Sequence, residues 1–366
     1  MKTKGLVYLA IITVSTIMLC GCQKQNPPLK ENFDKIETPI ASTSEAEKID
    51  PLLTEEKTTE PKETTLIFGG DVMLSRTVGQ KMEKYQDYTW PFKKIASLLS
   101  GADIVIINLE SPLTYSGKYF VPSGSFSFNA DPKSMQGLLL AGIDLAALAN
   151  NHFGNQGISG MRDTFKILQE KGIAFVGAGN NSTEAHQPAL IEKNGITFSF
   201  LNYGYPEDLY VASPSTPGIA NMDLAEMKKD VELAKQKSDA VIVMMHAGIE
   251  YINKPNSQQK EFAREAIDAG ADLVIGHHPH WVQVTEIYQG KPIIYSLGNL
   301  IFDQMWSTET QQGALAKVTF QDNLISSIEI IPIRIKDYGQ PEIISDEKEK
   351  KAMLSRMELA NEFLIK

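Results

Sequence analysis

Apolar stretches of strand length alternate with amphipathic stretches of helical period from residue 65 onward. Runs such as "DIVIINLE" (103–110) and "AVIVMMHAG" (240–248) are apolar almost without a break, as in strands that are covered on both faces. Stretches such as "GMRDTFKILQEKG" (160–172) and "SQQKEFAREAIDAG" (257–270) repeat apolar residues three and four apart, the period of a helix with one buried face. This alternation predicts an α/β fold built in layers.

Two turn signals add antiparallel strands to this pattern. "ALIEKNGITFSFLNY" (189–203) turns at Asn194-Gly195, and Gln289-Gly290 joins "VTEIY" (284–288) to "PIIYSLGN" (292–299). Two-residue turns of this kind connect hairpins, so the sheets are expected to be mixed. Further strands are expected at 65–74, 143–152, 174–179, 271–280, 315–320 and 325–335, and further helices at 90–102, 131–142 and 224–238.

Residues 1–22 have the features of a lipoprotein signal peptide. Lys2 and Lys4 precede an apolar run over 6–19, which is shorter than the roughly 20 residues of a membrane-spanning helix. The run ends in "LCGC", which resembles the bacterial lipobox, and Cys22 is therefore the predicted lipidation site. An uncleaved single-span anchor is the alternative. Both interpretations place the remaining chain on the extracytoplasmic face of the cell membrane.

The rest of the chain divides by composition. Residues 23–63 are rich in Pro, Glu, Lys, Thr and Ser and are predicted to form a disordered tether. Residues 64–340 are predicted to form one domain, and residues 341–366 a helix that packs on it. The apolar positions expected to face the domain are Met353, Leu354, Met357, Phe363 and Leu364.

Charge and cysteine content narrow the function. The net charge of −10 argues against a nucleic-acid partner, which needs a basic face. The two cysteines, Cys20 and Cys22, both lie in the signal segment, so no thiolate is left for a metal site in the domain. Any such site must use His, Asp, Glu or Asn.

Polar side chains of these types follow five of the expected strands. They are Asp71, Glu110, the group Asn150, Asn151 and His152, then His246, and finally His277, His278 and His280. Ligands bind outside the carboxyl ends of the strands in open α/β sheets, so these side chains are expected to meet at one edge. Each residue alone has a structural interpretation, as a turn former, a loop cap or a core histidine. Together they favour a dinuclear metal centre. His186 follows no strand and is expected on the surface.

The residues at these positions resemble the capsule-synthesis CapA family, also called the poly-γ-glutamate capsule proteins. This family belongs to the calcineurin-like metallophosphatase superfamily. The resemblance implies a four-layer α/β/β/α sandwich with mixed sheets and with metal at the sheet edge. The matching segments are "GDVMLSR" (70–76), "NLESPLT" (108–114), "LANNH" (148–152), "HAGIEY" (246–251), "GHHPHWVQ" (276–283) and "YSLGNLIFD" (295–303).

The resemblance also implies a role for each residue. Asp71 and His280 would bind a first metal, Glu110 would bridge, and a second metal would be bound by Asn151, His246 and His278. His152 would be the catalytic acid beside the metals, and His277 would be structural or would support a ligand. One position departs from the superfamily, because Met73 stands where a further histidine ligand is usual. A thioether is a poor ligand for a hard divalent ion. The first site therefore has few ligands.

The predicted function is a metal-dependent hydrolase-type site acting on a phosphoester or an amide. One or two divalent ions are expected, with Mn, Fe, Zn and Mg as candidates, and Arg76, Glu250 and Asn299 are predicted substrate contacts. The resemblance places this activity in poly-γ-glutamate synthesis or export, beside a membrane polymer synthase. Two alternatives stay open: a non-catalytic accessory subunit that binds the polymer, and a surface phosphoesterase unrelated to capsule.

Overall fold

The computed structural model describes residues 63–116, 125–205 and 210–359. All of them belong to one compact unit. The predicted signal peptide with Cys22, and the tether up to residue 62, lie outside the described residues. Within the described part of the chain, no helix has the length and apolar character needed to cross a membrane.

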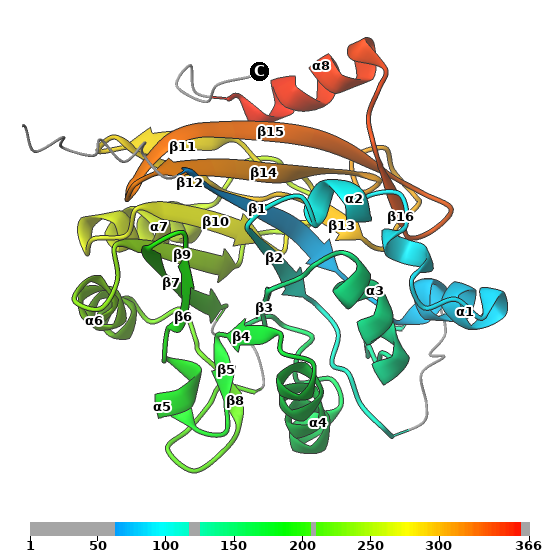
Figure 1. The fold of residues 1–366 in the computed structure, drawn as a ribbon, viewed down its shortest axis with the longest axis horizontal. Helices are drawn as coiled ribbons and strands as arrows, with labels where there is room; N and C mark the ends of the chain where they lie inside the picture. The colour runs from blue at the N-terminus through cyan, green and yellow to red at the C-terminus, as the bar shows by residue number, and fades with distance from the viewer. Residues whose placement is uncertain (1–62, 117–124, 206–209, 360–366) are drawn as a thin grey trace, which may run out of the picture. The chain divides into compact units, whose positions relative to one another are not determined.

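The larger sheet has a parallel half and an antiparallel half (Figure 1). Its strand order is β16-β15-β14-β1-β2-β3-β4, with β13 paired in parallel to the carboxyl end of β1. The parallel strands are β1 (Glu63–Val72), β2 (Ile104–Leu109), β3 (Leu145–Ala147), β4 (Ala174–Val176) and β13 (Asn299–Ile301). The antiparallel strands are β14 (Gln312–Gln321), β15 (Leu324–Lys336) and β16 (Gln340–Ile343).

The second sheet has the order β11-β12-β10-β9-β7-β6. Its strands are β6 (Ala189–Lys193), β7 (Ile196–Gly204), β9 (Ala240–His246), β10 (Leu273–His277), β11 (Thr285–Tyr288) and β12 (Lys291–Ile294). The two predicted hairpins are confirmed as β6–β7 and β11–β12. Asn194 and Gln289 have φ values of 53° and 49°, and the glycine after each is also left-handed, as such two-residue turns require.

The single strand predicted at 174–179 is wrong. The chain turns at Gly177, which has a φ of 85°, and Ala178–Gly179 forms β5, which pairs with β8 (Gly218–Ile219) in a separate two-stranded sheet. A Cβ atom at Gly177 would lie 2.4 Å from the Asn202 side-chain oxygen. Only glycine therefore fits this turn.

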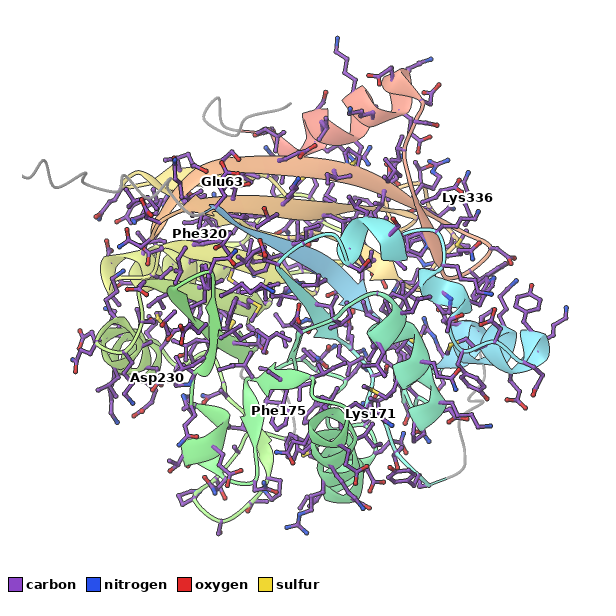
Figure 2. The ribbon with its side chains drawn as sticks, viewed as in Figure 1. Glu63, Lys171, Phe175, Asp230, Phe320 and Lys336 are labelled. Carbon is purple, nitrogen blue, oxygen red and sulfur yellow. The ribbon has the colours of Figure 1, made fainter. Side chains whose placement is uncertain are left out.

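Alternating side chains make the two sheets into a sandwich. Leu66 and Phe68 of β1 belong to the apolar cluster between the sheets, whereas Ile67 belongs to the cluster under the helices. Phe320 of β14, labelled in Figure 2, meets Phe198 of β7 edge-on between the sheets, with ring centroids 5.0 Å apart. Residues of both sheets thus form the apolar cluster between them.

Helices cover the two outer faces (Figure 1). Residues of α1 (Arg76–Tyr85), α2 (Ala96–Leu99), α3 (Met135–Leu140) and α4 (Gly157–Glu170) pack on the larger sheet. Residues of α6 (Leu224–Lys235) and α7 (Ser257–Asp268) pack on the second sheet. The expected four-layer α/β/β/α arrangement is confirmed. The remaining helices are α5 (Ser182–Ala185) and α8 (Glu347–Met357), whose Met353 and Met357 are buried against the inter-sheet cluster.

One predicted helix is broken, and the helices α1 and α5 were not predicted. Residues 90–102 form a 3₁₀ turn, η1 (Trp90–Phe92), and then the short helix α2, with a separate 3₁₀ turn, η2 (Pro132–Ser134), before α3. The irregular segment still buries Phe92, Ile95 and Leu99, which lie three and four residues apart and fill the outer layer. Helix α1 has a weak signal, since its interior contains a glycine and its only buried apolar side chains are Val78 and Met82.

Candidate metal centre

Five parallel strands end at the edge where the predicted site residues stand. In β1 and β2, Asp71 pairs with Asn108, and in β9 and β10, His246 pairs with His277. Even-numbered residues of β9 face the larger sheet, because Ile242 and Met244 lie in the inter-sheet cluster. His246 continues this alternation and therefore points toward β1.

A close backbone approach shapes the exit of β1. The register between β1 and β2 shifts between Phe68 and Asp71, and a Cβ atom at Gly70 would lie 1.9 Å from the Gly298 carbonyl oxygen. Only glycine allows this contact. It places Asp71 beside the segment that leads into β13, where Asp71 N donates to Gly298 O at 3.0 Å.

Glu110 lies at the centre of the site. Its Oε1 atom is 3.8 Å from His152 Nε2, 4.0 Å from His246 Nε2 and 4.0 Å from His280 Nε2. These separations exceed a hydrogen bond. Two atoms that each bind one ion at about 2.1 Å lie roughly 3–4 Å apart. The spacing of Glu110 from His246 and His280 therefore fits atoms that share an ion.

A second group of donor atoms surrounds His246. Its Nε2 atom is 3.0 Å from Asn151 Oδ1 and 3.1 Å from His278 Nδ1. These are the three residues that the family resemblance assigns to the second metal. Asp71, Glu110 and His246 also offer ligand atoms that all lie within 4.8 Å of one another. Asp71, Glu110, His246 and His280 are each at most 2% exposed.

Asp71 is held by groups from strand β2 and from the loop that follows β10. Asn108 Nδ2 donates to its Oδ1 at 2.8 Å, and His278 N donates to its Oδ2 at 3.3 Å. His280 Nδ1 lies 3.4 Å from the same Oδ2 atom. Burial alone would raise the pKa of the Asp71 carboxyl, but His280, His277 and Asn108 together hold it below its usual value. Asp71 is therefore ionised at neutral pH.

The histidines at the site, in contrast, favour the uncharged form of the ring. Burial, with the neighbouring imidazoles, lowers the pKa of His246 well below its usual value and the pKa of His278 to about 4. Neutral imidazole and ionised carboxylate are the forms that bind a metal. The side chains that could bind a metal are thus buried and offer oxygen and nitrogen atoms. They are also in the protonation states that bind a metal, so they fit a divalent ion.

His152 stands beside the donor set. Its ring stacks on Phe128 with centroids 3.9 Å apart, and its Nδ1 atom is 3.0 Å from Asn155 Oδ1. That oxygen also accepts from the Phe128 amide, so it is an acceptor and His152 Nδ1 carries the ring proton. Burial lowers the pKa of His152 to about 4. In this state Nε2 faces Glu110 with a lone pair and can accept a proton. The acid role predicted from sequence requires the ring to gain a second proton first.

Two of the predicted substrate contacts, Arg76 and Asn299, lie at the site, but both interact with other side chains of the protein. Arg76 is buried, pairs with Asp303, donates to Ser125 O and lies over Phe128 at 4.9 Å. Asn299 is fully buried, and its Oδ1 lies 2.9 Å from His280 Nδ1. Both residues thus support the side chains next to them, and Asn299 orients the His280 ring.

Glu250 is half-buried at the rim. Its negative charge raises the pKa of both His152 and His278, although burial dominates at each ring. Among the predicted substrate contacts, Glu250 is the one whose charge changes the pKa of these two histidines.

Met73 and His277 have structural positions. Met73 is fully buried, and its sulfur accepts a hydrogen bond from Ser75 N at 3.1 Å, so it takes no part in the donor set. His277 Nε2 donates to Gly69 O at 3.1 Å across the sandwich, which ties β10 to β1. This contact fits the structural alternative for His277.

Three neighbouring residues at the site have a strained backbone conformation. His278, His280 and Tyr251 have φ values of 97°, 57° and 63°, a region that costs non-glycine residues about 1–3 kcal/mol each. They contact one another, since the Tyr251 ring lies 6.0 Å from His280, which is 6.2 Å from His278. Strain gathered at one rim is typical of functional sites.

Sequence reasoning missed Asn108. It is fully buried, and its amide group contacts Asp71 Oδ1 and lies 3.2 Å from His246 Nδ1. Asn150 Nδ2 in turn donates to Asn108 Oδ1 at 3.2 Å. The available signal was an amide inside the apolar run "IVIINL", two residues before Glu110 and on the same face of β2.

The profile of the family described as "Bacterial capsule synthesis protein PGA_cap" matches residues 65–304, more than half of the chain. The chain belongs to this family. It is 32% identical to "Capsule biosynthesis protein CapA" of Bacillus anthracis, over 80% of this chain and 72% of that protein. It is 31% identical to "PGA biosynthesis protein CapA" of Bacillus subtilis (strain 168), over 79% of this chain and 76% of that protein.

The fold of this PGA_cap family member also matches a solved structure. A hypothetical protein from Thermus thermophilus aligns with 75% of this chain and 100% of its own, with a TM-score of 0.50 and 16% identity. A likeness at that identity concerns the fold alone. The comparisons thus establish the family, and the geometry adds a buried Asp-Glu-His group able to hold a metal ion.

Proposed function

We propose that this family member is a metal-dependent hydrolase that acts in poly-γ-glutamate capsule synthesis or export. The observation that carries the proposal is the position of Glu110 Oε1, 3.8–4.0 Å from the Nε2 atoms of three histidines. Two relatives whose names refer to capsule or PGA biosynthesis support the biological role.

The residues divide into two groups around Glu110. Asn151, His246 and His278 would hold one ion, and Asp71 and His280 the other, with Glu110 between them. Bound divalent ions lower the pKa of water and stabilise negative charge on a phosphoryl or carbonyl oxygen. Asn299 and Asn108 hold His280 and Asp71 in place by hydrogen bonds of 2.9 and 2.8 Å.

His152 is assigned the proton transfer. Its Nδ1 proton is fixed on Asn155, so Nε2 faces the reacting groups and can take a proton from an attacking water or return one to a leaving group. Phe128 stacks on the ring and keeps its plane fixed. His152 therefore combines proximity to the centre with a defined orientation.

The location and partners are part of the proposal. The lipobox-like "LCGC" and the charged tether favour a lipid-anchored protein on the extracytoplasmic face, beside a membrane polymer synthase. The chain, with a net charge of −10, repels a polyanion, so contact with polyglutamate is expected at the metal centre or at a local cationic surface.

The test pairs metal analysis with turnover of generic phosphodiesters and of polyglutamate by the purified full chain. We expect one or two divalent ions per chain, turnover that chelation abolishes, and a His152→Ala variant that keeps its metal but loses turnover. A His152→Ala variant with unchanged activity would contradict the catalytic role. Metal content unchanged in both His246→Ala and His278→Ala would contradict the ligand set. Polymer binding without turnover would favour the accessory-subunit alternative.

A further inference from the structure

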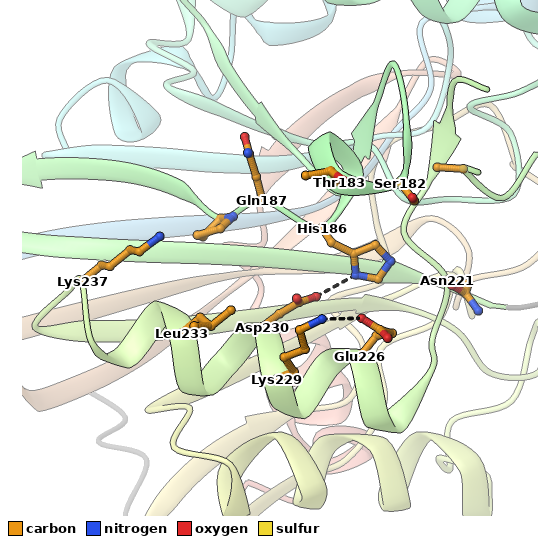
Figure 3. Close-up of a pocket in the computed structure, with 12 residues that line it drawn as sticks. Ser182, Thr183, His186, Gln187, Asn221, Glu226, Lys229, Asp230, Leu233 and Lys237 are labelled. Atoms are coloured by element: carbon orange, nitrogen blue, oxygen red, sulfur yellow. Dashed lines mark hydrogen bonds and ion pairs between the residues drawn. The ribbon is translucent and has the colours of Figure 1, made fainter. Parts of the chain in front are cut away.

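A cavity of about 570 Å³ lies between α5 and α6, and none of the proposed metal ligands lines it (Figure 3). His186 lines this cavity, and the sequence expectation that it lies on the surface is wrong, because its side chain is only 17% exposed. Its Nδ1 atom donates to Asp230 Oδ2 at 2.7 Å, and Lys229 Nζ lies 3.6 Å from Glu226 Oε2. Both acids of the cavity thus interact with side chains of its own lining, so the cavity indicates no class of ligand.

Arg76, in contrast, lies beside the metal centre and is held on several sides. It is buried, its guanidinium pairs with Asp303, and its Nη1 atom donates to Ser125 O at 3.2 Å. Asp303 is buried as well, and its Oδ2 atom accepts from Thr77 N at 3.1 Å. The ion pair therefore joins the first turn of α1 to the segment that follows β13, and both of its charges are engaged with protein.

The guanidinium also contacts two phenylalanine rings. Its Cζ atom is 4.9 Å from the centroid of the Phe128 ring and 5.3 Å from that of Phe302. A cation is attracted to the face of an aromatic ring at such distances, and the attraction is stronger where water is excluded. The two rings also contact each other edge-on, with centroids 5.9 Å apart. Arg76 and the two rings thus form one packed unit.

Each ring of this unit packs on a different histidine of the site. Phe128 stacks on His152 with centroids 3.9 Å apart, and the Phe302 ring lies 4.7 Å from that of His280. The hydrogen bond to Asn155 fixes one atom of the His152 ring, and the stack on Phe128 fixes the plane of the ring. The group that holds Phe128 therefore also determines where His152 Nε2 points.

The backbone and the chemistry of Arg76 agree with such a role. Its φ of 46° is left-handed, a conformation that a non-glycine residue keeps only where its surroundings enforce it. A planar guanidinium can pair with a carboxylate and stack on rings at the same time, which a lysine ammonium does less well. The position therefore requires arginine in particular, and not only a positive charge.

We propose that Arg76, paired with Asp303, is a positioning residue of the metal centre, which holds Phe128 and thereby the His152 ring in its reactive orientation. This role differs from the substrate contact predicted from the sequence, and the two roles have different consequences for mutants. The inference rests on the proposed function only in the assignment of proton transfer to His152.

The first experiment depends neither on metal nor on turnover. It records the carbon-bound ring protons of His152 by NMR, in the chelator-treated full chain in detergent, with ¹³C-labelled histidine and the His152→Gln variant for assignment. A ring stacked 3.9 Å away shields these protons, so the wild-type signal should lie upfield of that of an exposed histidine. Arg76→Met should move the signal toward the position of an exposed histidine, and Arg76→Lys should move it part of the way.

The second experiment measures steady-state turnover of a generic phosphodiester. Arg76→Met should lower kcat about 10–100-fold with KM within about twofold and metal content unchanged, because displacement of a catalytic group by about 1 Å has effects of this size. Arg162→Met, which changes an exposed arginine on α4, is the matched control and should alter neither kcat nor the NMR signal. Arg76→Met leaves the buried Asp303 charge unpaired, so the double variant Arg76→Met/Asp303→Asn is measured as well.

Two results would overturn the proposal. One is a His152 signal at its wild-type position in the folded Arg76 variants, and the other is a raised KM with unchanged kcat, which would mark Arg76 as a substrate contact. If both charge-removing variants unfold, Arg76→Lys decides, because it keeps a cation but loses the planar group. A wild-type chain without turnover would refute the proposed hydrolase function, whereas the NMR comparison would still decide the role of Arg76.

Discussion

Asn299 offers a sharp test of how the site is positioned. Its Oδ1 atom accepts from His280 Nδ1 at 2.9 Å, while its Nδ2 donates to Gln304 Oε1 and to Thr310 O at 3.2 and 3.0 Å. Asn299→Ala removes both functions. Asn299→Asp keeps an acceptor for His280, removes the donors and adds a negative charge next to the Thr310 carbonyl. The two variants therefore separate support of the metal ligand from support of the fold.

The expected magnitudes follow from these contacts. Loss of a residue that orients a ligand ring costs about 10–100-fold in metal affinity, or roughly 1.4–2.8 kcal/mol. We expect this loss for Asn299→Ala and near-wild-type affinity for Asn299→Asp. Both variants leave the Thr310 carbonyl without its donor, so both should lower the free energy of unfolding by about 1–3 kcal/mol.

The assay measures bound Mn²⁺ or Zn²⁺ against a competing chelator of known affinity, together with a thermal melt of each variant to confirm folding. The reasoning is refuted if folded Asn299→Ala binds metal as tightly as the wild type. It is equally refuted if Asn299→Asp loses as much affinity as Asn299→Ala, because the role would then be structural.

Three further predictions use other parts of the molecule. His152→Ala should reduce turnover at least about 100-fold with metal content unchanged, as measured by steady-state kinetics and metal analysis, and loss of metal in this variant would show that His152 is a ligand. Chelation should lower the melting temperature of the wild type, because a ligand that binds only the folded state stabilises it; a melt insensitive to chelator and to added Mn²⁺ would argue against a metal site. Asp272 is buried, but Lys291 and Lys235 hold its pKa below the usual value. Asp272→Asn should therefore cost roughly 2 kcal/mol at pH 7, and the difference should shrink below about pH 4, where the wild-type carboxyl gains a proton on unfolding; a difference in urea melts that is constant from pH 7 to pH 3 would contradict this.

The layered fold was predictable because its strands are long apolar runs with few competing interpretations. The polar residues at the ends of those runs were predictable for the same reason, since Asp71, Glu110, His246 and His278 each stand at the carboxyl end of an apolar run. Parallel strands bring their carboxyl ends to one edge, so local sequence was sufficient to place side chains that are far apart in the chain.

Contacts between distant segments could not be predicted in this way. Arg76 pairs with Asp303, and Asn299 orients His280, but neither residue carries a local signal of its partner. Asn108 was hidden inside a strand whose neighbours are all apolar. His186 follows no strand, and its partner Asp230 comes from the buried face of α6. These interactions arise from packing, which sequence periodicity does not encode.

Anomalous scattering from a crystal grown with Mn²⁺ tests the central claim most directly. The geometry predicts anomalous density at the strand edge, within ligand distance of Glu110 and of His246, His280 or both. A crystal with Mn²⁺ in the solution but without anomalous density beside Glu110, or with the ion bound at another set of residues, would contradict it.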